Sequence, residues 1–158
     1  MIQTQGELLL ENADVKTEII LAQWQTCVEM ANSVSQRRDT MNNIFVTLNL
    51  AIIAAVSINW DIKALVILTS GIVVCVIWMK FIYNYKLLNT AKFNVINEIE
   101  KKLPVAPFND EWRILKNNKK YKDSTKLEKI LPVMFIILFL IVIIAIFYIK
   151  FYIKGDQL

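Results

Sequence analysis

Four polar side chains lie on one face of a segment whose later residues are mostly apolar, and they form the first candidate functional site. They are separated by 3, 4 and 7 residues, which places them on roughly one side of a helix: Ser35, Arg38, Asn42 and Asn49. Polar residues at membrane depth usually face a bundle interior or a water-filled cavity. The pattern therefore predicts a pore lining, with a hydrophobic constriction that gates by dewetting. Its candidates are Arg38, Asn42, Asn49, Ile53 and Val56.

Asn49 and Arg38 each leave alternatives open. The amide of Asn49 either hydrogen-bonds a neighbouring helix, a contact worth roughly 0.6 kcal/mol on average in membranes, or joins Asn42 in a ring around a pore. Arg38 interrupts an otherwise apolar helix face, so its charge needs a partner. We consider Asp39 of a neighbouring chain, Glu98, or a bound anion. An Arg38 that faces an axis would attract anions to the mouth of a pore.

A second group combines basic residues with two aromatic ones. Such a mixture can bind a nucleotide, through charge on the phosphates and stacking on the base. It is equally typical of segments that lie against anionic lipid. No glycine-rich phosphate loop accompanies it, so an ATP-hydrolysing site is not expected. The candidates for ligand or lipid-phosphate binding are Arg37, Lys101, Lys102, Trp112, Lys116, Lys119, Lys120, Tyr121 and Lys122.

Catalysis has little basis in this sequence. There is no histidine, and the two cysteines, Cys27 and Cys75, are far apart. Carboxylates such as Glu98 and Glu100 lie two apart and point in different directions on a helix. We therefore expect no enzymatic activity, no catalytic residue, no metal and no cofactor. No DNA is expected among the partners, and neither cysteine is expected in a disulfide.

The elements that position these residues follow from composition. Hydrophobic residues make up 56% of 158 residues and the mean hydropathy is +0.44, more than a soluble domain of this size can bury. A membrane-spanning helix needs roughly 20 mostly apolar residues, and residues 43–60, 64–83 and 130–153 offer such stretches. Thr125 and Glu128 have the spacing of a capping box that would start the last one. The sequence predicts an all-α membrane protein with three transmembrane helices per chain.

Two of these helices are expected to continue beyond the bilayer. Apolar residues three and four apart run from Ile20 to Ala55, interrupted only by Arg38. The first two spans therefore extend into a cytoplasmic helical stalk, and Asn109 is expected to cap a short helix after Pro107. The predicted segments are a flexible N-terminal segment (1–16), a cytoplasmic helix continuous with the first span (17–59), the second span and its cytoplasmic extension (64–103), a short cytoplasmic helix with a basic loop (104–127), the third span (128–153) and an external tail (154–158).

Lysine and arginine set the expected orientation. Twelve lie between Lys80 and Lys129, against one in the loop 60–63 and two near the C-terminus. Loops rich in these residues stay on the cytoplasmic side. Residues 84–129 and the N-terminus are therefore predicted to be cytoplasmic, and the C-terminus external, in a multi-pass membrane protein.

Residues 88–112, LNTAKFNVINEIEKKLPVAPFNDEW, are also distinctive together with SQRRDT at 35–40. These runs resemble the RipA-like small integral membrane proteins of bacteria, which are described as octameric, and the resemblance covers about residues 28–137. It implies a bacterial inner membrane and a ring-shaped homo-oligomer. A looser similarity, in architecture only, is to the SLATT-type effectors of bacterial conflict systems, which are thought to perforate the cell's own membrane when a nucleotide signal arrives.

The three spans also differ in character. The third is apolar on every side, as a helix in lipid would be, whereas the first carries polar residues and is expected inside the ring. These differences predict a homo-oligomeric pore, and the similarity to SLATT-type effectors implies that it acts as a membrane-disrupting effector of signal-triggered anti-phage defence. Its expected partners are its own copies, membrane lipids, and a small nucleotide signal or a cytoplasmic protein. The alternative is a non-conducting oligomeric scaffold that recruits a cytoplasmic partner in envelope stress or lipid metabolism.

Overall fold

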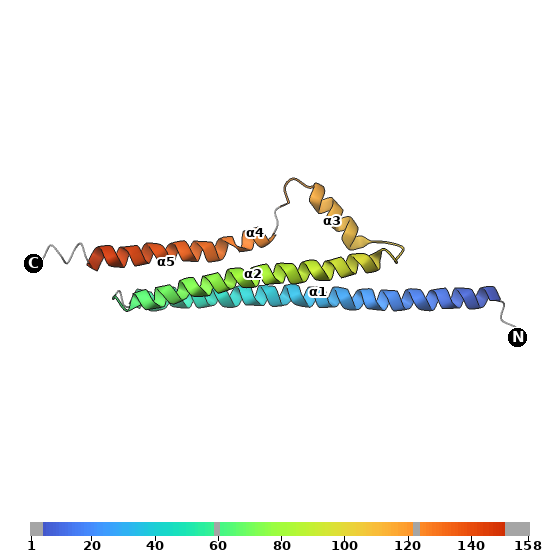
Figure 1. The fold of residues 1–158 in the computed structure, drawn as a ribbon, viewed down its shortest axis with the longest axis horizontal. Coiled ribbons are helices and arrows are strands. Elements are labelled where there is room, and N and C mark those ends of the chain that lie inside the picture. The colour runs from blue at the N-terminus through green and yellow to red at the C-terminus, as the bar shows by residue number, and fades with distance from the viewer. Residues whose placement is uncertain (1–4, 59–60, 122–123, 151–158) are drawn as a thin grey trace, which may run out of the picture. The chain divides into compact units, whose positions relative to one another are not determined.

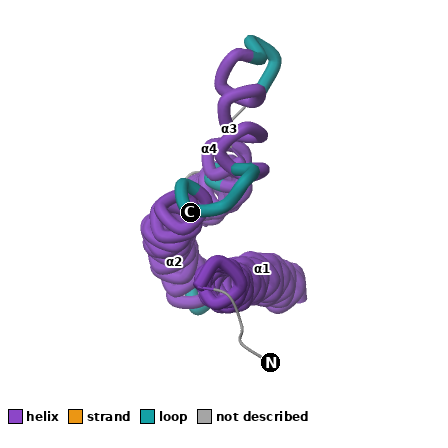
Figure 2. Tube along the Cα trace, turned by 90° about the vertical axis from the view of Figure 1, so that its right-hand side faces the viewer, coloured by secondary structure: helices purple, strands orange, loops and turns teal. Residues whose placement is uncertain are grey.

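The computed structural model describes residues 5–58, 61–121 and 124–150, and these residues are almost entirely helical (Figure 1). The helices are α1 (Gln5–Ile58), α2 (Ala64–Glu100), α3 (Pro107–Asn117), α4 (Ser124–Glu128) and α5 (Ile130–Tyr148). Figure 2 shows helices joined by short loops, and no strand occurs in these described ranges.

The positions of proline explain where the helices begin and end. Pro104 follows the end of α2, Pro107 lies in the first turn of α3, and Pro132 lies near the start of α5. Proline is tolerated in a first turn because the amide hydrogen that it lacks would have no partner there. No proline interrupts α1 or α2, so both helices run long.

Three helical stretches are long and apolar enough to cross a membrane: Asp14–Ile58, Ala64–Glu100 and Ser124–Tyr148. The prediction of an all-α protein with three spans is therefore confirmed. The helix bounds differ from the expected ones, because α1 begins at Gln5 and α2 ends at Glu100. Residues 1–4 of the expected flexible segment and the whole external tail lie outside the described residues.

The chain divides into two compact units. The polar unit consists of Met1–Gln36 and Leu87–Tyr121, and the span unit of Arg37–Lys86 and Lys122–Leu158. The three apolar stretches found in the sequence all belong to the span unit.

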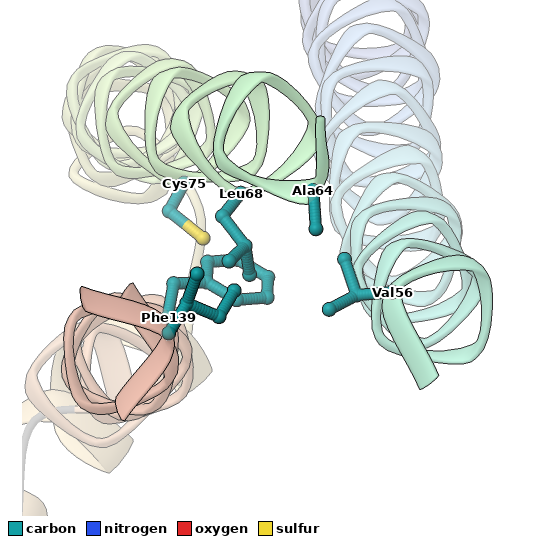
Figure 3. Close-up of a cluster of buried hydrophobic side chains, with 6 residues drawn as sticks. Val56, Ala64, Leu68, Cys75 and Phe139 are labelled. Carbon is teal, nitrogen blue, oxygen red and sulfur yellow. The ribbon is translucent and has the colours of Figure 1, made fainter. Parts of the chain in front are cut away.

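The core of the span unit joins α1, α2 and α5. Figure 3 shows Val56 from α1, Leu68 and Cys75 from α2, and Phe139 from α5 converging on one another. Cys75 and Phe139 are completely buried. A methyl group added to Gly71 would lie 2.7 Å from Cε2 of Phe139. The glycine therefore permits the close approach of α2 to α5.

The polar unit is organised around the buried carboxylate of Glu100, which is 1% exposed. Its oxygens accept hydrogen bonds from the backbone N–H groups of Phe108 (3.2 Å) and Asn109 (3.1 Å) and from the indole of Trp24 (3.3 Å). These backbone groups lie in the first turn of α3, where amides have no partner within the helix. The expected cap by Asn109 is wrong, because α3 begins at Pro107 and Glu100 supplies the acceptor instead.

Candidate functional site

An ion pair joins the first helix of the span unit to the segment before α5. Arg38 donates from Nε and Nη2 to Oε2 of Glu128, both at 2.8 Å, and from Nη2 to the hydroxyl oxygen of Thr125 at 3.1 Å. The side chains of Arg38 and Glu128 are only 14% and 24% exposed. Charges this well covered need a partner, since removal from water disfavours an isolated charge.

Asn42, one turn further along α1, extends this network to α2. Its Nδ2 donates to Oε2 of Glu128 at 3.3 Å, and its Oδ1 accepts a hydrogen bond of 2.8 Å from the indole nitrogen of Trp78. The Trp78 ring is 1% exposed and stacks on Phe45 with 5.6 Å between ring centroids. One amide therefore couples three segments of the span unit.

Asn49 is completely buried, two turns beyond Asn42. Its Nδ2 donates to the carbonyl oxygen of Phe45 at 2.7 Å, and its Oδ1 accepts a hydrogen bond from Sγ of Cys75 on α2 at 3.1 Å. This geometry matches the interpretation in which the amide joins two helices.

The predicted pore-lining residues thus share one environment, the interior of the span unit. Val56 is 4% exposed, and Ile53 packs against the same apolar core. A pore lined by them stays a prediction. Within the protomer Arg38 contacts Glu128, which the sequence-based alternatives did not include, and Glu98 pairs with Lys101. Pairing of Arg38 with Asp39 of a neighbouring chain, or with a bound anion, stays a prediction. The predicted capping box is also wrong, because Thr125 lies within α4 and both members of the box face Arg38.

The opposite face of α1 carries small and polar side chains, with the exposed apolar side chains of Leu50 and Ile58 among them. We call it the Thr47 face, and its members are all exposed and three or four residues apart: Asn43, Thr47, Ala51 and Ala54. Thr47 precedes Asn49 by two residues, which is roughly 200° around a helix. The exposed face of α5 differs because no serine, threonine, amide or charged side chain lies among its long apolar ones, such as Met134, Ile141 and Ile144.

The predicted basic group lies almost wholly on the surface. Lys101 pairs with Glu98 at 2.6 Å, and Nζ of Lys116 lies 5.4 Å from the centre of the Trp112 ring. Tyr121 meets Trp112 edge to face at 6.3 Å. Lys102, Lys119, Lys120 and, in the span unit, Arg37 are exposed, while Lys122 lies outside the described residues.

Sequence reasoning missed a cavity of about 420 Å³ between α2 and α3 in the polar unit. Its walls include Phe93 and Trp112, and two of its lining residues, Asn89 and Asn97, have buried Oδ1 atoms without a hydrogen-bond partner. The eight-residue spacing of these two asparagines on α2 was the available signal, and neither residue stands out alone. In the parts of the chain that the structure describes, no cluster of His, Cys, Asp or Glu is arranged to hold a metal ion.

Three apolar helices, joined by buried polar contacts and carrying a separate helical unit, define a polytopic α-helical membrane protein. The chain belongs to the octameric membrane protein family (8xMP), which it matches over residues 21–148. The suspected resemblance to a RipA-like octameric family is therefore confirmed, and the protein is an oligomeric membrane protein. No curated protein and no solved structure gives a significant match.

Proposed function

We propose that the protein forms a gated pore whose axis is lined by the Thr47 face of α1. The observation that carries this proposal is the opposition of two polar faces on one helix. Arg38, Asn42 and Asn49 are engaged inside the span unit, whereas Asn43 and Thr47 are exposed on the other side. A member of an octameric family must bury some surface between its copies, and this face suits a polar axis.

The side chains of this face also suit close packing around an axis. Ala51 and Ala54 let helix backbones approach closely, as small residues commonly do between membrane helices. The exposed face of α5 presents Met134, Ile141 and Ile144, which match a lipid environment. These contrasts support α1 as the inner helix and α5 as the outer one.

The lining proposed here differs in charge from the sequence-based one. Arg38 is neutralised by Glu128 within the protomer, so no ring of eight free guanidinium groups forms at the mouth. Asn43 and Thr47 are neutral hydrogen-bonding groups. The pore is therefore expected to select weakly between anions and cations, since fixed charge is what discriminates ions by sign.

The proposal extends to the biological role. The protein sits in a bacterial inner membrane with its N-terminus and residues 84–129 in the cytoplasm, which the distribution of lysine and arginine supports. It acts as an effector of anti-phage defence, opened by a signal that binds the polar unit. No catalytic step is part of this role.

Thiol modification tests the lining. In a background with Cys27→Ser and Cys75→Ala, Thr47→Cys protein in liposomes should conduct ions, and a charged methanethiosulfonate reagent should change the flux. Leu138→Cys, on the exposed face of α5, is the matched control and should not respond. Liposomes that stay ion-tight with every trigger, or an equal response from both variants, would contradict the proposal.

A second function, a non-conducting scaffold, is favoured by one observation on α3 and the loop before it. Val105, Ile114 and Trp112 are 71%, 67% and 45% exposed, which leaves apolar surface available to a cytoplasmic partner in envelope stress or lipid metabolism. Ile114→Asp would then abolish partner recruitment. In the pore proposal the same change leaves ion flux intact.

A further inference from the structure

We propose that the cavity between α2 and α3 binds a nucleotide with an amino-bearing purine base. The role of this nucleotide as the signal that opens the pore rests on the function proposed above, whereas its binding to the cavity does not. Ligand sites typically occupy some 300–1,000 Å³, and the cavity of about 420 Å³ lies in this range.

The chemistry of the walls indicates which ligand atoms fit. The buried Oδ1 atoms of Asn89 and Asn97 lack hydrogen-bond partners, and the carboxylate of Glu111 also lines the cavity. Each of these Oδ1 atoms exposes less than 1 Å² of surface, so a ligand in the cavity would reach it by rotation of the side-chain amide. An unpaired buried acceptor costs free energy, so a ligand that supplies N–H or O–H donors is favoured there. Adenine, guanine and cytosine carry exocyclic amino groups, whereas uracil has none, and the two fused rings of a purine offer the larger surface to the aromatic walls.

The aromatic residues add a second requirement, a flat ligand. Phe93 lies between the two asparagines on α2, and Trp112 faces the same cavity from α3. Aromatic side chains stack on bases with a contribution that does not depend on the exact base. Asn89 and Asn97 are eight residues apart, about 12 Å along a helix at ~1.5 Å per residue. That span exceeds one base and suits a base with its ribose hydroxyls.

The charge outside the cavity favours phosphate on the same ligand. Lys116 reaches over the Trp112 ring, and Tyr121 packs against that ring directly after Lys119 and Lys120 in sequence. An ammonium group on a flexible chain is a suitable partner for phosphate oxygens. A positively charged polyamine, which would also satisfy the acceptors, is disfavoured by these lysines.

Binding of ATP, GTP and UTP to the full-length detergent-solubilised oligomer tests the proposal by calorimetry. We expect ATP or GTP to bind about tenfold or more tightly than UTP, inorganic triphosphate or the corresponding nucleoside. Asn97→Leu should weaken this binding by about tenfold or more without lowering the melting temperature, because it removes an unpaired buried acceptor. Asn84→Leu, an exposed position on the same helix, is the matched control and should bind as the wild type does.

Several results would overturn the site. Absence of binding by both purine nucleotides at about 1 mM would do so, as would equal affinity for UTP or for triphosphate alone. Unchanged affinity in Asn97→Leu would place the ligand elsewhere. If the purine nucleotide binds as described but leaves liposome flux unchanged, the site stands and its role as the opening signal fails.

Discussion

The guanidinium group of Arg38 and the carboxylate of Glu128 lie 2.8 Å apart, although 90 residues separate them in the chain. The pair joins α1 to the segment that begins the third apolar stretch. The carboxylate of Glu128 also accepts a hydrogen bond from Nδ2 of Asn42, and Oδ1 of Asn42 accepts one from the indole of Trp78. Arg38, Asn42 and Asn49 thereby serve the packing of one protomer, and the Thr47 face lies exposed on the opposite side of the helix.

Loss of the Glu128 carboxylate should destabilise the span unit. Hydrogen bonds to charged groups contribute roughly 1.5–3 kcal/mol, and Glu128→Ala leaves Arg38 poorly solvated. We expect the free energy of unfolding in detergent to fall by about 2 kcal/mol. Glu98→Ala, which removes a pair whose members are 70% and 68% exposed, is the control and should change stability by less than about 0.5 kcal/mol. Equal effects of the two changes would contradict this account.

Gly71→Ala should disturb the contact between α2 and α5. The added methyl group would lie 2.7 Å from the completely buried ring of Phe139, which has little room to move. Overpacking of this kind costs about 1–3 kcal/mol. Thermal unfolding should therefore show a lower midpoint, and the second change Phe139→Leu should recover part of the loss. A stability of Gly71→Ala equal to that of the wild type would rule out this close approach.

Glu100→Ala should loosen α3 within the polar unit. Two backbone amides of its first turn and the indole of Trp24 would lose their shared acceptor, at a cost of about 1–3 kcal/mol. Hydrogen exchange measured by mass spectrometry should become faster for peptides that contain Phe108 and Asn109. Glu98→Ala provides the exposed control on the same helix. Unchanged protection in Glu100→Ala would show that the carboxylate does not hold α3.

Asn49→Leu separates packing from conduction. The side chain makes one contact to a neighbouring helix, through Cys75, and such contacts are worth roughly 0.6 kcal/mol on average in membranes. We expect a small loss of stability and an unchanged ion flux, because the Thr47 face lies on the other side of α1. Thr47→Leu should in contrast reduce the flux strongly. If Asn49→Leu reduced the flux and Thr47→Leu did not, the pore would be lined by the face that carries Arg38, Asn42 and Asn49.

The sequence predicted the elements better than their contacts. Hydropathy and length identified the three spans because lipid imposes a simple requirement on each segment separately. Helical periodicity also placed Arg38, Asn42 and Asn49 on one face correctly, yet it cannot say what that face contacts. The contact of Arg38 with Glu128, 90 residues further along the chain, has no counterpart in that local pattern.

Local patterns were the least reliable guide to the sites. Thr125 and Glu128 have capping-box spacing, but their side chains contact Arg38, whose charge needs a strong acceptor. The cap of α3 comes from Glu100 rather than from Asn109. Asn89 and Asn97 gave no signal as single residues. The cavity that they line arises only when α3 packs on α2.

A density map of the purified oligomer, viewed along its symmetry axis, tests the arrangement of the spans most directly. The account predicts that Thr47 and Asn43 of every copy point toward the axis, with Met134 and Ile141 of α5 against lipid. A map with α5 at the symmetry centre, or with the Thr47 face of α1 against lipid, would contradict it.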